Sequence, residues 1–271
     1  MTENRIVRAL TGVRDAGRTA LMPFVTAGYP DLDTTIELLP RLERAGASVC
    51  EIGLAYSDPI ADGPVIAESM HEVLESGTTL DDVLSGIRRA RDSIAMGLVV
   101  MVSYSIVHRI GLESFVTKCL DAGFDGFIFP DLPVEESGDA CRVTADAGAT
   151  CSLLVAPNTA EKRANRIAEA CTGFVYLLAR AGITGERSGV PSSVGPRVEQ
   201  LRSVTGTPIA CGFGISTAEA VRAVTSHADA AIVGSAIVRR MKDSAALPRD
   251  EMLDVIEGFV KELAGGLAER E

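Results

Sequence analysis

The stretch "RAGASVCEIGL" (residues 44–54) contains the pattern that decides the fold. Its glycine, Gly46, follows a segment with helical spacing of apolar residues, and a short run rich in apolar and β-branched residues comes next. The same order returns in "DAGFDGFIFPDL" (121–132) and "DAGATCSLLVA" (146–156). A glycine in this position is typical of a helix C-terminus, and the apolar run after it predicts a buried strand.

Apolar runs of this kind occur eight times along the chain. They are LMPFVT (21–26), VCEIGL (49–54), GLVVMVSY (97–104), GFIFPDL (126–132), CSLLVA (151–156), FVYLLAR (174–180), PIACGF (208–213) and AAIVGS (230–235). Helix-period segments such as 34–46, 112–123 and 250–265 separate or follow them. Alternating strands and helices indicate parallel strands covered by helices, and eight units in about 250 residues match a TIM barrel. We therefore predict an α/β fold, with one (β/α)8 barrel domain over residues 1–271 and an extra N-terminal helix.

A doubly wound open sheet is the alternative architecture for this pattern. Such a sheet binds phosphate with a glycine-rich turn after its first strand. The corresponding segment here, "FVTAGYPD" (24–31), contains a single glycine. The barrel is therefore favoured.

Composition and charge limit the classes of partner. The chain has 271 residues, 46% of them apolar, and a net charge of -11 without any Lys/Arg block. This charge opposes binding to a nucleic-acid backbone or an anionic membrane. The N-terminus, "MTENRIVRAL", lacks the apolar stretch of a signal peptide, and no apolar run is long enough to span a membrane. We expect a cytoplasmic protein whose partners are small molecules or protein.

The six cysteines form no C-x-x-C pair and mostly lie among apolar neighbours. We expect them to be small buried hydrophobic residues, not disulfides or metal ligands.

The strand at 49–54 carries an unexpected charge, Glu51. Side chains alternate along a strand, so if Cys50 and Ile52 face the helices, then Val49, Glu51 and Gly53 face the barrel interior. Glu51 also lies near the C-terminal end of its strand, where barrel enzymes keep their chemistry. A lone buried carboxylate is costly unless it is paired or protonated, which favours a functional role over a structural one.

The loop "YSDPIADGP" (56–64) follows this strand and holds two more carboxylates. Its two prolines and its glycine fix the path of the chain, which suits a loop that holds Asp62 over the barrel mouth. Asp58 stands directly before Pro59 and is either a site residue or only a turn residue.

Small residues follow the last three strands, in "RAGITGERSG" (180–189), "CGFGIS" (211–216) and "VGSAI" (233–237). Such loops allow backbone N–H groups to approach an anion, and the loops after strands seven and eight of these barrels commonly bind phosphate. The sequence therefore predicts a phosphorylated substrate.

Two other chemistries are disfavoured. A Schiff-base aldolase needs a lysine inside the barrel, but all four lysines fall in helix-period segments. The three histidines are far apart and show no metal-ligand spacing, so we predict no metal site. Acid-base catalysis by carboxylates remains.

The chain resembles the tryptophan synthase alpha chain family over nearly its whole length. The residues that carry the resemblance are "PFVTAGYPD" (23–31), "EIGLAYSDPIADGP" (51–64), "FPDLPVEES" (129–137), "YLLARAGITG" (176–185), "GFGIS" (212–216) and "VGSAIV" (233–238). The resemblance implies a carbon-carbon lyase of tryptophan biosynthesis that cleaves indole-3-glycerol phosphate to indole and glyceraldehyde 3-phosphate. It also implies no cofactor in this chain, and a partner beta chain that carries pyridoxal phosphate and forms an α2β2 heterotetramer.

The same resemblance implies a role for individual residues. Glu51 would be the general acid-base residue, and Asp62 the carboxylate that pairs with the indole N–H. The other implied positions are Gly185, Gly214, Gly234 and Ser235 at the phosphate, Phe24 and Tyr176 at the indole, and Asp58 and Asp131 near the partner interface. Phe24 and Tyr176 also fit ordinary positions in the core of a strand.

This chain departs from the family pattern at two places. Ala55 stands where many relatives have proline, and Ser103 and Ser105 stand where relatives usually have tyrosine and asparagine. Tyr104 could replace that tyrosine only if its side chain turned inward. Three other functions stay open: a stand-alone lyase that releases free indole, a non-catalytic phosphate-binding subunit, and an isomerase of another sugar phosphate.

Overall fold

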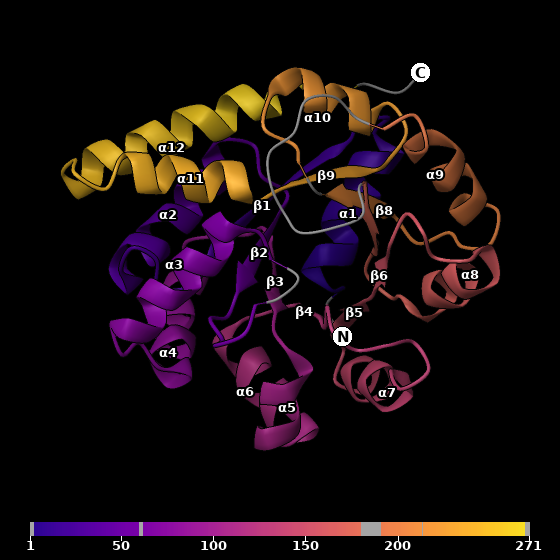
Figure 1. Cartoon of the computed structure of the whole chain (residues 1–271), viewed down its shortest axis with the longest axis horizontal. Coiled ribbons are helices and arrows are strands. Elements are labelled where there is room, and N and C mark those ends of the chain that lie inside the picture. Colours follow the sequence, from indigo (N-terminus) through magenta and orange to yellow (C-terminus); the bar gives the residue numbers. More distant parts are fainter. Residues whose placement is uncertain (1–2, 60–61, 180–190, 213, 269–271) are drawn as a thin grey trace.

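The chain forms a parallel barrel whose fifth strand is split into two pieces (Figure 1). The computed structural model describes residues 3–59, 62–179, 191–212 and 214–268. The described residues form a sheet with the order β5-β4-β3-β2-β1-β9-β8-β7-β6. The strands are β1 (Ala20–Thr26), β2 (Val49–Gly53), β3 (Gly97–Met101), β4 (Gly126–Ile128), β5 (Thr150–Ser152), β6 (Leu154–Val155), β7 (Val175–Leu178), β8 (Ile209–Gly212) and β9 (Ala230–Val233).

The split strand closes the barrel. β5 pairs with β4 and β6 pairs with β7, and only Leu153 separates β5 from β6. Residues 150–155 therefore occupy one barrel position, and the predicted run CSLLVA appears as two short strands. The prediction of an eight-membered (β/α)8 barrel is confirmed.

Helices surround the strands, and all except the N-terminal helix lie on the outside of the barrel (Figure 1). They are α1 (Arg5–Asp15), α2 (Leu32–Arg44), α3 (Pro64–Glu75), α4 (Leu80–Arg91), α5 (Tyr104–Ile110), α6 (Leu112–Ala122), α7 (Gly138–Asp146), α8 (Glu161–Ala170), α9 (Val194–Arg202), α10 (Ala218–Thr225), α11 (Ser235–Asp243) and α12 (Arg249–Ala264). None of the helices in the described ranges is long and apolar enough to cross a membrane.

The glycines of the repeated sequence pattern end helices as predicted. Gly46, Gly123 and Gly148 have φ angles of 106°, 103° and 77°, and they follow α2, α6 and α7. Glycine adopts this left-handed conformation without the steric cost that a side chain adds. Each helix can therefore stop within a few residues of the next strand.

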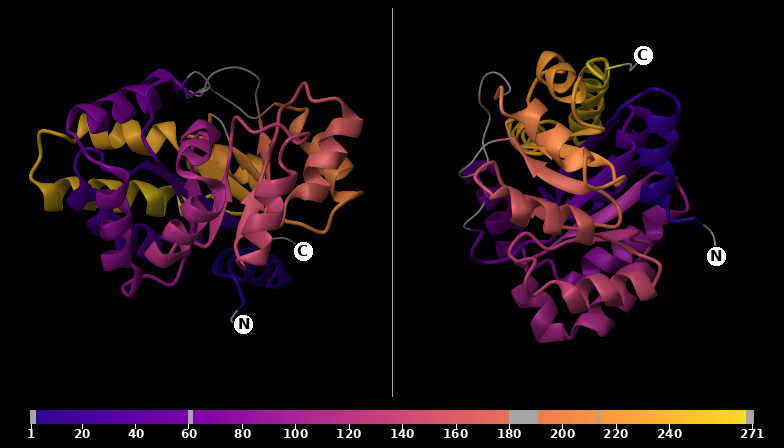
Figure 2. Two further views of the ribbon diagram at one scale, coloured as in Figure 1. Left: turned by 90° about the horizontal axis from the view of Figure 1, so that it is seen from below. Right: turned by 90° about the vertical axis from the view of Figure 1, so that its right-hand side faces the viewer.

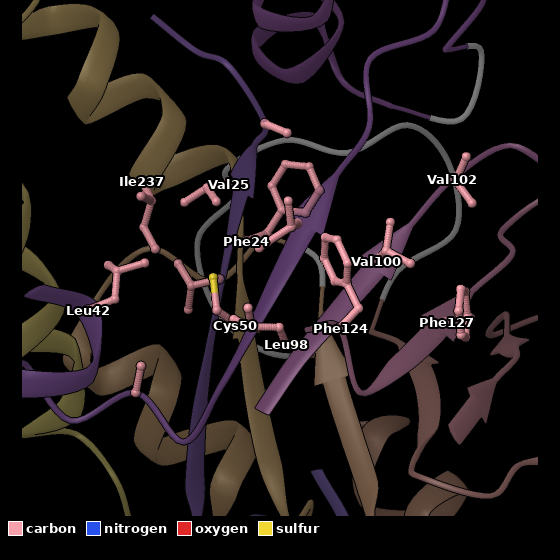
Figure 3. Packing of buried hydrophobic residues seen from close by; sticks show 14 of the residues in the cluster. Phe24, Val25, Leu42, Cys50, Leu98, Val100, Val102, Phe124, Phe127 and Ile237 are labelled. Carbon is pink, nitrogen blue, oxygen red and sulfur yellow. The ribbon is translucent and has the colours of Figure 1, made fainter. Parts of the chain in front are cut away.

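The hydrophobic core has two layers. The larger layer joins the outward-facing side chains of the strands to the helices, and Figure 3 shows part of it: Val25, Cys50, Leu98 and Val100 with Leu42 and Ile237. The smaller layer fills the barrel interior and includes Met22, Val49, Val99, Ile128 and Ile232. Side chains of β2 thus alternate between the layers, as the sequence predicts.

The expected N-terminal helix, α1, closes one end of the barrel (Figure 2). Ile6 and Leu10 are fully buried against the interior layer. Asn4 donates a hydrogen bond of 2.7 Å to the Asp125 carbonyl, and Arg5 forms a 3.0 Å ion pair with the Asp125 carboxylate. Because Asp125 directly precedes β4, α1 lies at the N-terminal ends of the strands and leaves the other end free for a site.

Candidate functional site

Glu51 lies inside the barrel, in register with Phe24 of β1 and Val99 of β3. Its side chain is fully buried. Neither carboxyl oxygen has a hydrogen-bond partner among the residues that the structure describes. A buried carboxyl group in this setting strongly prefers its neutral, protonated form.

Burial, together with the negative charge of Asp62, raises the pKa of Glu51 from 4.5 to about 8. Glu51 is therefore a carboxylic acid at neutral pH. A group with a pKa near the working pH can both give and accept a proton during one reaction cycle.

Asp62 stands just before α3, on the loop that follows β2. Burial raises its pKa, whereas the hydroxyl of Tyr56, which donates a 3.1 Å hydrogen bond to Asp62 Oδ2, lowers it. Because the charge of Asp62 contributes to the raised pKa of Glu51, Asp62 ionises first as the pH rises. The pair thus provides one acid and one carboxylate.

Both carboxyl groups line one pocket with largely apolar walls. Its lining residues are Phe24, Glu51, Asp62, Ile66, Met101, Pro130, Leu154, Tyr176, Gly214, Ile215, Ile232, Gly234 and Ser235. Such a pocket suits a flat apolar group held by a few polar contacts.

Two interior glycines leave room for the aromatic rings of this pocket. A Cβ atom at Gly53 would lie 2.5 Å from the Phe24 ring, and one at Gly212 would lie 2.9 Å from the Tyr176 hydroxyl. Both distances are too short for a side chain, so the glycines on β2 and β8 make space for rings on neighbouring strands. Phe24 and Tyr176 are each 5% exposed and face the pocket.

Three residues of the pocket lining, Gly214, Gly234 and Ser235, have features that suit an anion. Gly234 is the N-cap of α11, and Ser235 is the first residue of that helix. The Ser235 hydroxyl is buried and has no hydrogen-bond partner in the described ranges. Gly214 lines the same pocket and has a φ angle of +80°. A helix N-terminus with free N–H groups attracts negative charge. Gly185, also expected at the phosphate, lies outside the described residues.

Asp58 and Asp131 lie in a neighbouring groove, which they line together with Tyr56, Ser103 and Pro130 among others. Pro130 also lines the pocket of Glu51, so the two cavities share a wall. Ser103 donates a 2.7 Å hydrogen bond to Asp131, and Asp58 is exposed. The structure therefore brings Asp58 and Asp131 together beside the pocket.

Several neighbours of the carboxyl pair were not identified from the sequence. Met101, and not Ser103 or Tyr104, is the β3-side residue that lines the pocket. Tyr104 packs edge-on against Phe129, with 5.5 Å between ring centroids. The hydrogen bond from Tyr56 to Asp62 was also not predicted. Strand alternation from Val99 could have indicated Met101, whereas the position of a loop side chain has no comparable signal.

Among the described residues, the pocket is lined by no lysine and by no set of metal ligands. All four lysines, Lys118, Lys162, Lys242 and Lys261, are exposed residues on helices, as expected from the sequence. In the described ranges, His, Cys, Asp and Glu form no group of three or more that could hold a metal ion.

Comparison with known proteins agrees with this geometry. A family model for the tryptophan synthase alpha chain matches residues 10–266. The tryptophan synthase alpha chain of Synechocystis sp. is 42% identical over 261 residues, which are 96% of this chain and 98% of that one. The alpha chain of Rhodopirellula baltica is 42% identical over 253 residues, which cover 92% and 91% of the two chains.

Solved structures give the same result. A Mycobacterium tuberculosis tryptophan synthase structure aligns with a TM-score of 0.87 at 30% identity and covers 99% of each chain. The alpha subunit of Legionella pneumophila tryptophan synthase aligns with a TM-score of 0.87 at 28% identity and covers 98% of each chain. The resemblance seen in the sequence motifs is confirmed, and the chain belongs to the tryptophan synthase alpha chain family, the lyase subunits that cleave indole-3-glycerol phosphate in tryptophan biosynthesis.

Proposed function

We propose that this chain cleaves indole-3-glycerol phosphate to indole and glyceraldehyde 3-phosphate, with Glu51 as general acid and base and Asp62 as the partner of the indole N–H. One observation carries the assignment: Glu51 is a fully buried carboxyl group without a hydrogen-bond partner in the described ranges, and it shares an apolar pocket with Asp62. The N-terminus of α11 lines the same pocket, and a substrate phosphate would be stabilised there.

The first step is protonation of the indole ring at C3. Glu51 is protonated at neutral pH because burial raises its pKa to about 8, so it can donate this proton. The electron pair of the C2–C3 double bond takes up the proton, and positive charge develops on the ring nitrogen. The ionised carboxylate of Asp62 stabilises that charge through the N–H group.

The second step breaks the bond between C3 and the glyceryl carbon. The electron pair of this bond returns to the ring, which restores the neutral indole. The hydroxyl group on the glyceryl carbon becomes an aldehyde, and its proton moves to the Glu51 carboxylate left by the first step. Glu51 is thereby protonated again, and no water molecule or other acid is consumed.

Tyr56 supports the second carboxylate in this scheme. Its hydroxyl binds Asp62 Oδ2 and opposes the effect of burial on the pKa of Asp62. This hydrogen bond favours the ionised form of Asp62 beside a protonated Glu51, and the other oxygen of Asp62, Oδ1, can accept the indole N–H. A non-catalytic phosphate-binding barrel would have no use for this pair of carboxyl groups with different pKa values.

The groove that holds Asp58 and Asp131 is the proposed contact for a beta chain. It lies directly beside the pocket, which would allow indole to pass to a second protein without entering water. Pyridoxal phosphate would belong to that beta chain, in an α2β2 heterotetramer. A cytoplasmic location is part of the proposal, and the six unpaired thiols fit a reducing compartment.

Release of indole from indole-3-glycerol phosphate by the purified chain is the direct test of the reaction. Indole should form together with an equal amount of glyceraldehyde 3-phosphate. An isomerase would consume the substrate without releasing indole, and a non-catalytic subunit would leave it unchanged.

Glu51→Gln should lower turnover by at least about 100-fold, because an amide of the same size cannot transfer the proton. Substrate binding should be largely kept, so the Michaelis constant should change little. Steady-state assays measure both constants. Glu113→Gln, at an exposed carboxylate on α6, is the matched control and should keep full activity. Near-normal turnover of Glu51→Gln would contradict the assignment of Glu51 as the general acid and base.

The pH dependence of the free energy of unfolding should reveal the raised pKa of Glu51 without an activity measurement. The pKa of Glu51 is about 8 in the folded chain against 4.5 as its ordinary value, so the unfolded chain loses its proton first. Ionisation of Glu51 therefore does not change the free energy of unfolding below pH 4.5. Between pH 4.5 and about pH 8 it lowers this free energy progressively, and above pH 8 the loss stays constant.

Thermal melting of Glu51→Gln and the unsubstituted chain at pH 5, 7 and 9 checks this expectation. The advantage of Glu51→Gln in melting temperature should be larger at pH 9 than at pH 5, because glutamine does not ionise. Glu113→Gln should show no such trend. If the difference in melting temperature were the same at every pH, the pKa of Glu51 would not be raised in the folded chain.

Gly234→Val should weaken binding of glyceraldehyde 3-phosphate by at least about tenfold, since a branched side chain would occupy space at the N-terminus of α11. A Cβ atom at position 234 would lie 3.4 Å from Phe24, which is an ordinary van der Waals contact, so the barrel should accommodate the substitution. Calorimetric titration should show a much smaller change for indole. Gly258→Val is the control, because a Cβ atom added at this glycine would meet no other atom within 4 Å. An equal loss for both ligands would indicate damage to the fold.

A cognate beta chain should raise the rate of indole formation by at least about tenfold, equivalent to roughly 1.4 kcal/mol of transition-state stabilisation. Closure of loops over a site commonly completes a catalytic arrangement, and the loop with Asp62 adjoins the groove proposed for the partner. Rate assays with and without the beta chain, together with analytical ultracentrifugation, provide the measurement. Full activity alone and no complex at micromolar protein would instead indicate a stand-alone lyase.

A further inference from the structure

Two cysteine sulfur atoms are in contact on the side of the barrel where α7 covers β5 (Figure 1). The Sγ atom of Cys141, on α7, lies 3.7 Å from the Sγ atom of Cys151, on β5. Neither residue lines the pocket of Glu51 or the groove of Asp58 and Asp131. The proposed lyase reaction makes no use of this contact.

Cys141 differs from the other five cysteines in its accessibility. It is half-buried, whereas Cys50, Cys119, Cys151, Cys171 and Cys211 are buried. A small reagent in solution can therefore reach Cys141 first. The neighbouring thiol, Cys151, is buried.

The two groups of thiols also differ in acidity. The hydrogen bond with Cys151 lowers the pKa of Cys141 to about 7, although burial acts in the opposite direction, and the Ser137 hydroxyl lowers it further. Burial raises the pKa of Cys119 and Cys211 to about 12. The thiolate is the nucleophile, so the lower pKa of Cys141 makes it more reactive at neutral pH than Cys119 or Cys211.

We propose that Cys141 and Cys151 form a site of oxidative modification, at which a peroxide converts the two thiols to a disulfide between α7 and β5. The inference rests on the sulfur contact and on the exposure of Cys141, and it does not depend on the lyase reaction. Sulfur atoms that start 3.7 Å apart need a modest side-chain movement to reach the bonded distance of about 2.05 Å.

The chemistry proceeds in two balanced steps. The Cys141 thiolate attacks one peroxide oxygen, the O–O bond breaks, and a sulfenic acid forms while the second oxygen leaves as water after taking a proton. The Cys151 sulfur then attacks the sulfenic sulfur, so that the S–S bond forms and the S–O bond breaks. The oxygen leaves as a second water with the proton of Cys151. The two thiols lose two electrons, and the peroxide gains them.

The disulfide would fasten α7 to the strand that neighbours β4. The connection between β4 and α7, residues 129–137, carries Asp131 and would then be anchored at both of its ends. Cys171 is not the expected second thiol, because its sulfur already accepts a 3.2 Å hydrogen bond from the Leu153 amide.

Brief treatment of the whole chain with hydrogen peroxide at neutral pH, followed by alkylation and peptide mapping, tests the proposal. The expected product has lost two hydrogen atoms, links the peptides of Cys141 and Cys151, and returns to the dithiol with dithiothreitol. Before oxidation, Cys141 should be alkylated at least about tenfold faster than Cys119 or Cys211. Cross-links between other cysteines, or wild-type Cys141 oxidised to the sulfinic acid beside a free Cys151, would overturn the proposal.

Variants identify the role of each sulfur. Cys151→Ala should stop at the Cys141 sulfenic acid, which dimedone traps, whereas Cys141→Ser should form no disulfide. Cys119→Ser is the matched control and should form the disulfide like the unsubstituted chain. Mapping of the unsubstituted protein decides the question even if Cys151→Ala fails to fold. A disulfide that still forms in Cys141→Ser would contradict the assignment.

Discussion

The two-residue period of β2 places an ionisable group where no described residue offers it a hydrogen bond, and the site is organised around this constraint. Cys50 and Ile52 must point to the helices to fill the outer core, so Glu51 must point inward. Turning Glu51 outward would turn the two apolar residues inward as well. The alternation of side chains along β2 therefore holds Glu51 in a buried position that disfavours its charged form. The raised pKa of Glu51 follows from that position.

The lining of the Glu51 pocket combines aromatic rings with the N-terminus of a helix. Gly53 and Gly212 leave the space that the Phe24 and Tyr176 rings occupy, which keeps water away from the carboxyl group. The N-terminus of α11 lines the same pocket, and its partial positive charge favours an anion there. One substrate with a flat apolar end and an anionic end would match both features at once.

The sequence predicted the features that depend on local periodicity. The barrel, the helix-ending glycines such as Gly46 and the inward direction of Glu51 all follow from spacing along one element, and the structure confirms them. Features that depend on the conformation of a loop, or on how separate elements pack together, had no such signal. The Tyr56–Asp62 hydrogen bond lies within a loop, and the contact of Cys141 with Cys151 depends on how α7 rotates against β5. Position 185, expected at the phosphate, lies outside the described residues.

Buried carboxylates at the opposite end of the same barrel show what a structural role requires. Asp125 accepts a hydrogen bond from the Leu98 amide and forms an ion pair with Arg5, and Asp229 accepts from the Ile209 amide and pairs with Arg202. Those partners compensate for lost hydration, so both groups stabilise the N-terminal ends of the strands. Glu51 lacks such compensation among the described residues, although the chain readily provides it elsewhere. A carboxyl group left without partners lowers stability, and its presence in the pocket is best explained by a substrate that supplies the missing partner.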